Sequence, residues 1–168
     1  MSTQVPEASL SQVIARVAAA IDSDWLSTGD RAALRRMSLD EPPPLVFYRF
    51  ALRYLPDGWD ANEESRRNWM TLVTGMALMS PNPHRPDMPF GKALAEEGYS
   101  EARLERLLSA EGDTQRALLL RAARFLAAKT AACNWVHPAQ LLLTHQFREE
   151  CRRRIARDFY MNIEKKTA

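Results

Sequence analysis

The sequence predicts an all-α fold, a helical bundle of about eight or nine helices. Apolar residues recur every three or four positions along most of the chain, and no segment alternates as a strand does. Residues that cap helices, and prolines that end them, separate these periodic segments. With 168 residues, of which 46% are hydrophobic, the chain can form one domain or two small helical lobes that share a core.

Four helices are predicted in the first half of the chain. The first covers residues 9–21, and the second is a short helix that carries the sequence RAALRR and begins at Thr28 or Asp30. Three prolines precede the third helix, residues 45–55, and its many aromatic residues predict that it is mostly core. An Asn at the start of residues 62–79 can cap the fourth.

A loop and two further helices follow. Residues 80–89 contain four prolines and cannot form regular structure. Residues 91–98 read as a short helix that is closed by the glycine at its end. Ser100 can cap the next helix, in which three leucines face inward while Arg103 points elsewhere.

The central predicted helix covers residues 114–133 and is capped by Asp113. When residues are placed 100° apart, one side collects the apolar residues Leu118, Leu119, Ala122, Phe125 and Leu126. Arg116, Arg121 and Arg124 fall on the opposite arc, and no acidic residue of the helix lies among them. The arc therefore predicts an exposed basic surface.

Two helices complete the chain. A His-Pro pair is expected to cap residues 139–146, and the last helix covers residues 147–163. Arg148 and Arg152 border the apolar stripe of this last helix, where a docking surface would begin. The stripe itself consists of Phe147, Cys151, Ile155 and Phe159.

Charge is distributed unevenly along the chain. Residues 114–148 contain five basic residues and no Asp or Glu, so their counter-charge must be water, another part of the fold or an anionic ligand. Residues 1–99 carry ten basic and 13 acidic side chains, whereas residues 100–168 carry 13 and eight. Of the 23 basic residues 19 are Arg, which suits phosphate but is also what codon bias in a GC-rich genome produces. On a chain of net charge +2, this distribution predicts a localised anion-binding surface.

Cysteine content and hydropathy predict a cytoplasmic protein. Cys133 and Cys151 are too few for a disulfide framework, and both occupy apolar helix positions, so we expect buried, reduced thiols. The sequence shows no signal peptide and no apolar run of about 18 residues, so no membrane partner is expected.

The sequence contains no pattern that is typical of an active site. Its three histidines are not at metal-ligand spacing from either cysteine, and its six glycines are scattered rather than gathered in a phosphate-binding loop. Paired glutamates occur at 63–64 and 96–97, but neighbours diverge by about 100° on a helix and do not form an acid–base pair. We therefore expect no enzymatic activity, no metal and no cofactor.

The residues alone are compatible with two functions. Arginines on several helices without paired carboxylates can follow a phosphate backbone with salt-dependent affinity. The basic arc carries no aromatic residue for base stacking, so this contact would be independent of base sequence. The alternative is a helical protein–protein adaptor in a multi-subunit assembly, whose arginines meet acidic proteins and make no direct nucleic-acid contact.

Several motifs occur in an order that resembles a known family. They are GDRAALRR, FYRF after the prolines, FGKALAEEG after a variable loop, SEARLERLL, LLLRAARFLA, NW before HPAQLL, and the closing RRRIARDFY. Over residues 10–162 the chain is similar to the CasB (Cse-two) small subunit of the type I-E CRISPR surveillance complex, Cascade.

The resemblance implies an all-helical, non-catalytic protein of antiviral defence with two lobes, at about residues 9–98 and 99–163. Two copies would lie beside the backbone and large subunits of Cascade. Their basic surface would contact the displaced non-target DNA strand and the guide RNA backbone. Because R-loop formation is a nearly balanced strand exchange, such weak contacts can keep the R-loop open.

The predicted nucleic-acid-binding residues come from the resemblance and from helix geometry. Helix geometry alone contributes Arg116. The loop at residues 80–89 departs from the lysine-bearing loop of some family members, because Arg85 is its only fixed positive charge. The resemblance contributes Arg35, Arg36, Lys92, Arg103, Arg121, Arg124, Arg148 and Arg152.

Overall fold

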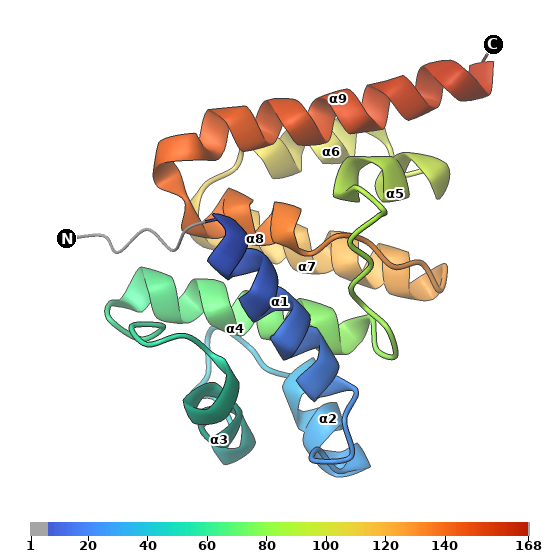
Figure 1. Cartoon of the computed structure of the whole chain (residues 1–168). Coiled ribbons are helices and arrows are strands. Elements are labelled where there is room, and N and C mark those ends of the chain that lie inside the picture. The colour runs from blue at the N-terminus through green and yellow to red at the C-terminus, as the bar shows by residue number, and fades with distance from the viewer. Residues whose placement is uncertain (1–6, 168) are drawn as a thin grey trace.

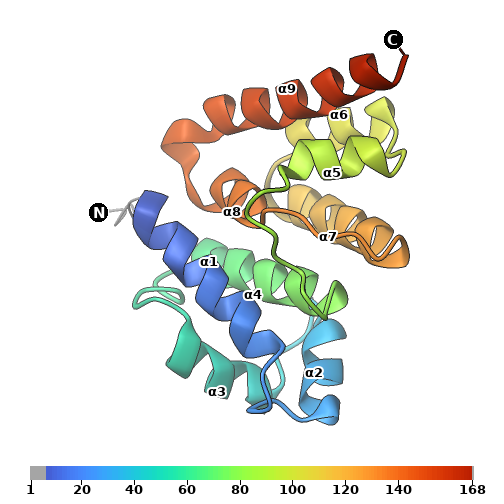
Figure 2. The same cartoon turned by 45° about the vertical axis from the view of Figure 1, so that its right-hand side comes forward.

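The computed structural model describes residues 7–167, which form nine α-helices, one short 3-10 helix and no strand, so the all-α prediction is confirmed. The helices lie in successive layers: α9 is at one end, then α5 with α6, then α7 with α8, then α4 with α1, and α2 with α3 at the other end (Figures 1 and 2). Their bounds are α1 Glu7–Ile21, α2 Thr28–Arg35, α3 Leu45–Tyr54, α4 Glu63–Leu78, α5 Phe90–Glu96, α6 Glu101–Ser109, α7 Gly112–Ala128, α8 Val136–Leu143, η1 His145–Phe147 and α9 Arg148–Thr167.

Side-chain caps fix the start of three helices. The Asn62 Oδ1 accepts the Ser65 backbone N–H at 2.8 Å, and the Ser100 Oγ accepts the Arg103 N–H at 3.2 Å, which confirms both predicted caps. α2 begins at Thr28, one of its two predicted starts, and the Ser27 Oγ caps it by accepting the Asp30 N–H. The first helix already includes Glu7, two residues before the predicted start.

The bounds of α7 differ from those predicted. The helix begins at Gly112 after Glu111, so Asp113 lies in its first turn and is not its cap. It ends at Ala128, five residues early, because Thr130 adopts a left-handed φ of 53° and the Ala131 N–H turns back to the Leu126 carbonyl.

The predicted cap of the next helix is also wrong. α8 begins at Val136, so His137 lies inside it and is buried. The Nδ1 of His137 accepts the backbone N–H of Phe90 at 3.3 Å, which links α8 to the start of α5. The side chain therefore joins two helices instead of starting one.

The core is centred on α4, in which every residue from Asn68 to Ala77 is buried. This helix contacts α1, α2, α7 and α8, so it needs apolar residues on all sides rather than along one stripe. Its buried amide at Asn68 is paired: the Nδ2 donates to the carbonyl oxygen of Leu142 in α8 at 3.0 Å.

Helices α5 and α9 pack with almost no space between their backbones. A Cβ atom added at Gly91 of α5 would collide with the carbonyl oxygen of Ile155 and lie 3.0 Å from the backbone nitrogen of Phe159. Three of the four predicted stripe residues of α9 are buried, but Phe147 is 49% exposed. Phe147 belongs to the 3-10 helix before α9, so it does not share the register of the stripe.

Both cysteines are free and buried, as predicted. Burial raises the pKa of the Cys133 thiol, and it raises that of Cys151 to about 11. Within residues 7–167 no helix is both long and apolar enough to span a bilayer. The predicted division into two lobes stays a prediction.

Candidate nucleic-acid interface

The exposed side of α7 carries two unpaired arginines. Arg121 and Arg124 are both exposed, and neither forms a hydrogen bond or ion pair with any described residue. The small side chains of Thr114, Ala117 and Ala128 lie on the same exposed side, so nothing on α7 covers the two guanidinium groups. The predicted basic surface is therefore present at these two positions.

Arg103 of α6 joins this side of the molecule. Its guanidinium carbon lies 4.5 Å from the ring centroid of Tyr99 and 5.1 Å from that of Phe125 in α7. Burial raises the pKa of the Tyr99 phenol, while the charges of Arg103 and Arg121 act in the opposite direction. Both cations thus lie near one phenol, which brings α6 and α7 into a single surface.

Lys129 also belongs to this surface, although it was absent from the predicted set. A helix that continued to Cys133 would place Lys129 near the apolar arc. In the structure Lys129 is the C-cap residue of α7, and its side chain is exposed, with its Nζ 5.9 Å from the Phe125 ring centroid. A long side chain at the end of a helix can reach solvent even from a position near the apolar arc. We call Arg103, Arg121, Arg124 and Lys129 the α6–α7 basic surface.

Arg116 is not exposed, which corrects its predicted place on this surface. Its side chain is only 6% exposed because α4 covers this side of α7. The Nε donates to the Oδ1 of Asn68 at 2.8 Å, and the Nη1 donates to the Oδ1 of Asp113 at 2.7 Å. Arg116 therefore holds two helices together and does not reach a ligand.

We expect Arg116→Ala to lower the free energy of unfolding by about 2 kcal/mol, because it leaves a void and removes the partner of the buried Asn68 oxygen. Arg124→Ala, on the exposed side of the same helix, should change it by less than about 0.5 kcal/mol. Urea unfolding of both variants measures the difference. Equal losses would show that Arg116 has no special structural role.

The predicted binding residues before position 99 differ in their partners. The Nε of Arg35 donates to the carbonyl oxygen of Ala77 at 3.0 Å, where a cation stabilises the C-terminal end of α4. Lys92 lies 3.9 Å from the carboxylate of Glu96, one turn further along α5. Arg36 is exposed and has no ion pair with the described residues. Of these three cations, Arg36 is the most available to a ligand.

Arg148 and Arg152 point into the molecule rather than along the α6–α7 basic surface. The side chain of Arg148 is 17% exposed, and its guanidinium lies 2.7 Å from the His145 Nδ1 and 3.9 Å from the Glu111 carboxylate. The Nε and Nη2 of Arg152 are buried without a hydrogen-bond partner, and the residue lines a hollow between α6 and α9. The structure thus separates these two residues from Arg121 and Arg124.

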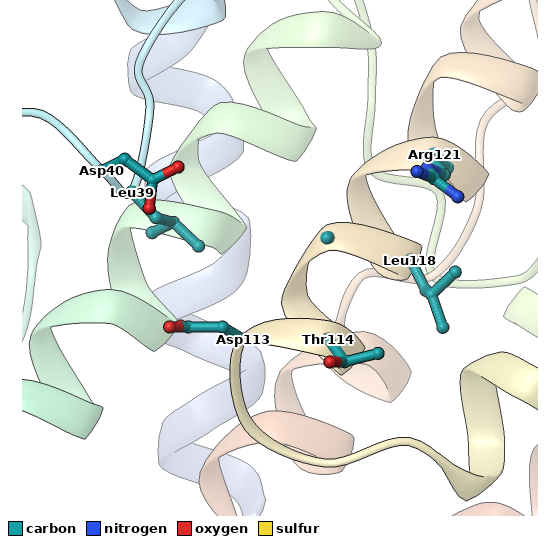
Figure 3. A pocket seen from close by; sticks show the side chains of 7 residues that line it. Leu39, Asp40, Asp113, Thr114, Leu118 and Arg121 are labelled. Carbon is teal, nitrogen blue, oxygen red and sulfur yellow. The ribbon is translucent and has the colours of Figure 1, made fainter.

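A groove of about 370 Å³ lies beside Arg121. Figure 3 shows the loop before α3 on one side of it and α7 on the other. Arg67 of α4 joins the two walls, because its Nη1 donates to the Leu39 carbonyl oxygen at 3.2 Å and to the Asp113 Oδ1 at 3.3 Å. The groove is lined by Leu39, Asp40, Asp113, Thr114, Ala117, Leu118 and Arg121.

The histidines have structural partners. The Nδ1 of His84 accepts the Trp135 N–H at 3.1 Å, and burial lowers the pKa of His84, which favours this neutral acceptor form. His145 lies 2.9 Å from the carboxylate of Glu64. Among residues 7–167 no three His, Cys, Asp or Glu side chains are placed to hold a metal ion.

Two solved structures share this fold. A chain in a crystal structure of E. coli Cascade bound to a PAM-containing double-stranded DNA target is 22% identical, with a TM-score of 0.65 over 96% of this chain and 99% of that one. The Cse2-family CRISPR-associated protein of Thermus thermophilus is 23% identical, with a TM-score of 0.64 over 94% and 99%. At these identities the likeness shows the fold.

The protein family is shown by a match between the sequence and a family model. A search among curated proteins gave no match. The family model described as CRISPR-associated protein Cse2, however, matches residues 30–160, which is most of the chain. The helices that carry the α6–α7 basic surface lie inside this match. The chain therefore belongs to the Cse2 family of CRISPR-associated proteins.

Proposed function

We propose that this chain is the small subunit of a type I-E Cascade complex and that it binds the nucleic-acid backbone through the α6–α7 basic surface and Arg36. The observation that carries the proposal is the exposure of Arg121 and Arg124 with no carboxylate partner in the described chain. A guanidinium in this state is free to donate two parallel hydrogen bonds to a phosphate. Arg103 and Lys129 extend the same surface across two helices.

The strand best suited to such contacts is the displaced non-target DNA strand. Once the guide RNA pairs with the target strand, the displaced strand is single-stranded and its phosphates are exposed. Cations that hold it disfavour its re-annealing, and the strand exchange is balanced closely enough for a few contacts to matter. The guide RNA backbone offers the same phosphate chemistry. This role in antiviral defence requires no catalytic residue.

Family membership supports a place in the assembly. The similar E. coli chain belongs to a Cascade complex bound to DNA. By analogy, this chain would contact the Cascade backbone and large subunits and a second copy of itself. Arg35, Lys92, Arg148 and Arg152 would act in these protein contacts or in folding, because each already lies beside other groups of the chain.

A salt titration tests the proposal. The full chain, alone and in the assembled complex, is titrated with labelled single-stranded DNA, and fluorescence anisotropy measures the dissociation constant. With three or four phosphate contacts, the logarithm of the association constant should fall with the logarithm of salt concentration with a slope of roughly −2 to −3. This slope should be the same for strands of different base sequence.

The alternative function, an adaptor without nucleic-acid contact, is favoured by one feature of α3. Leu45 and Leu52 are 85% and 84% exposed on one side of this helix, and Tyr48 between them is 42% exposed. Arg49 and Arg53 lie beside this apolar stripe, so it suits a partner protein with acidic residues around an apolar centre. Absence of DNA binding at low salt, in both forms of the protein, would favour the adaptor.

A further inference from the structure

The groove beside Arg121 has acidic residues in its lining, whereas the surface around it is basic. Arg121 lies at its edge, whereas Asp40 supplies a carboxylate on the opposite wall (Figure 3). Leu39, Ala117 and Leu118 give the groove apolar lining. A phosphate would be attracted to the edge and repelled from the interior.

The carboxylate of Asp40 is the available acceptor in this groove. The Oδ1 of Asp113 already accepts hydrogen bonds from Arg67 and Arg116, and in Figure 3 this carboxylate points away from Leu118. The Asp40 carboxylate has no hydrogen-bond or ion-pair partner among the described residues, and the side chain is exposed. An incoming group with N–H donors can therefore reach it.

The walls are held in place before any ligand arrives. Arg67 bonds the Leu39 carbonyl oxygen of one wall and Asp113 at the start of the other. Arg116 bonds the same Asp113 from inside the molecule. The groove volume of about 370 Å³ falls within the range of small-ligand sites, roughly 300–1,000 Å³.

We propose that this groove accepts one unpaired base of the DNA strand whose phosphates lie on Arg121, and that it prefers guanine. The inference rests on the proposed function, and it adds a modest base preference to otherwise sequence-independent binding. A base presents flat apolar faces to the lining and hydrogen-bond donors along its edge, which matches the distribution of groups in the groove.

The preference follows from the donors on each base. Guanine offers N1–H and the 2-amino group side by side, so a single carboxylate can accept both. Adenine and cytosine offer one amino group next to an acceptor nitrogen. In thymine the single N3–H lies between two carbonyl oxygens, which repel the Asp40 carboxylate. We therefore expect guanine to bind best and thymine worst.

The test compares oligo(dT) with the same strand carrying one central dG, using the full chain and fluorescence anisotropy at fixed low salt. The dG strand should bind about fivefold tighter, as expected of one bidentate contact. In Asp40→Ala this ratio should fall to about one, although loss of the negative charge should strengthen binding of both strands. Asp60→Ala removes an exposed carboxylate outside the groove and should keep the fivefold ratio.

A second variant fills the groove without changing charge. Ala117→Leu should also abolish the ratio while leaving the affinity for oligo(dT) unchanged. The inference fails, and the proposed function stands, if the native chain binds both strands equally with the expected salt slope. A ratio that survives both Asp40→Ala and Ala117→Leu would likewise overturn it. Absence of binding to either strand would overturn the proposed function and this inference together.

Discussion

Changing Arg121 and Arg124 together to Ala is expected to weaken the binding of single-stranded DNA about 30-fold at low salt, because each loses a charge-assisted contact with a phosphate. The slope of the salt dependence should become shallower by about 1.4, which corresponds to two contacts on a single strand. Both side chains are exposed and Ala favours helix, so circular dichroism should show unchanged helix content.

A matched double variant separates this surface from net charge. Arg153 and Arg157 are exposed on α9 and do not belong to the α6–α7 basic surface, and their change to Ala removes the same charge. We expect less than about a threefold effect on DNA affinity from this pair, since only long-range attraction is lost. Equal weakening by the two double variants would contradict a localised site. Unfolding of the Arg121 and Arg124 variant would make those arginines structural.

Gly91→Ala is expected to lower the free energy of unfolding by about 3 kcal/mol. The new methyl group would collide with the carbonyl oxygen of Ile155, which is backbone and cannot rotate aside. α5 and α9 would have to separate, and the contacts around buried Phe159 would weaken. Urea unfolding monitored by circular dichroism measures the change.

Gly29→Ala provides a control that should change the free energy of unfolding in the opposite direction. Gly29 lies inside α2, and a Cβ there would have only the Ser27 Oγ nearby, at 3.9 Å. The same substitution should therefore stabilise the protein by about 0.5 to 1 kcal/mol through helix propensity. If both variants lose stability equally, the close approach of α5 to α9 is not what Gly91 provides.

The helices and several of their ends could be predicted because local residues determine them. Asn62 and Ser100 cap their own helices, so a short stretch of sequence contains the whole interaction. The proline-rich loop could be predicted as well, since a proline lacks the N–H that a helix needs. Arg121 and Arg124 could be predicted because α7 is amphipathic and its polar side faces solvent at these two positions.

What the sequence did not reveal depends on distant packing. Arg116 lies among the same cations, but α4, which is far away in the sequence, covers it and binds it through Asn68. A helical projection of α7 uses only the residues of α7, so it cannot predict that α4 packs against the side that carries Arg116. Lys129 was missed because the projection places it near the apolar arc, whereas its long side chain reaches solvent from the C-cap position of α7.

The polar contacts behind the groove form one chain of shared hydrogen bonds from the buried Asn68 to the exposed Asp113. Its members, in order, are the carbonyl oxygen of Leu142, the side chains of Asn68, Arg116, Asp113 and Arg67, and the carbonyl oxygen of Leu39. Because each member satisfies its neighbour, a substitution at one leaves the next without its partner. Sequence drift should therefore exchange these side chains as a set. A substitution in the wall of the groove is thus expected to disturb the buried packing of α4 and α7 as well.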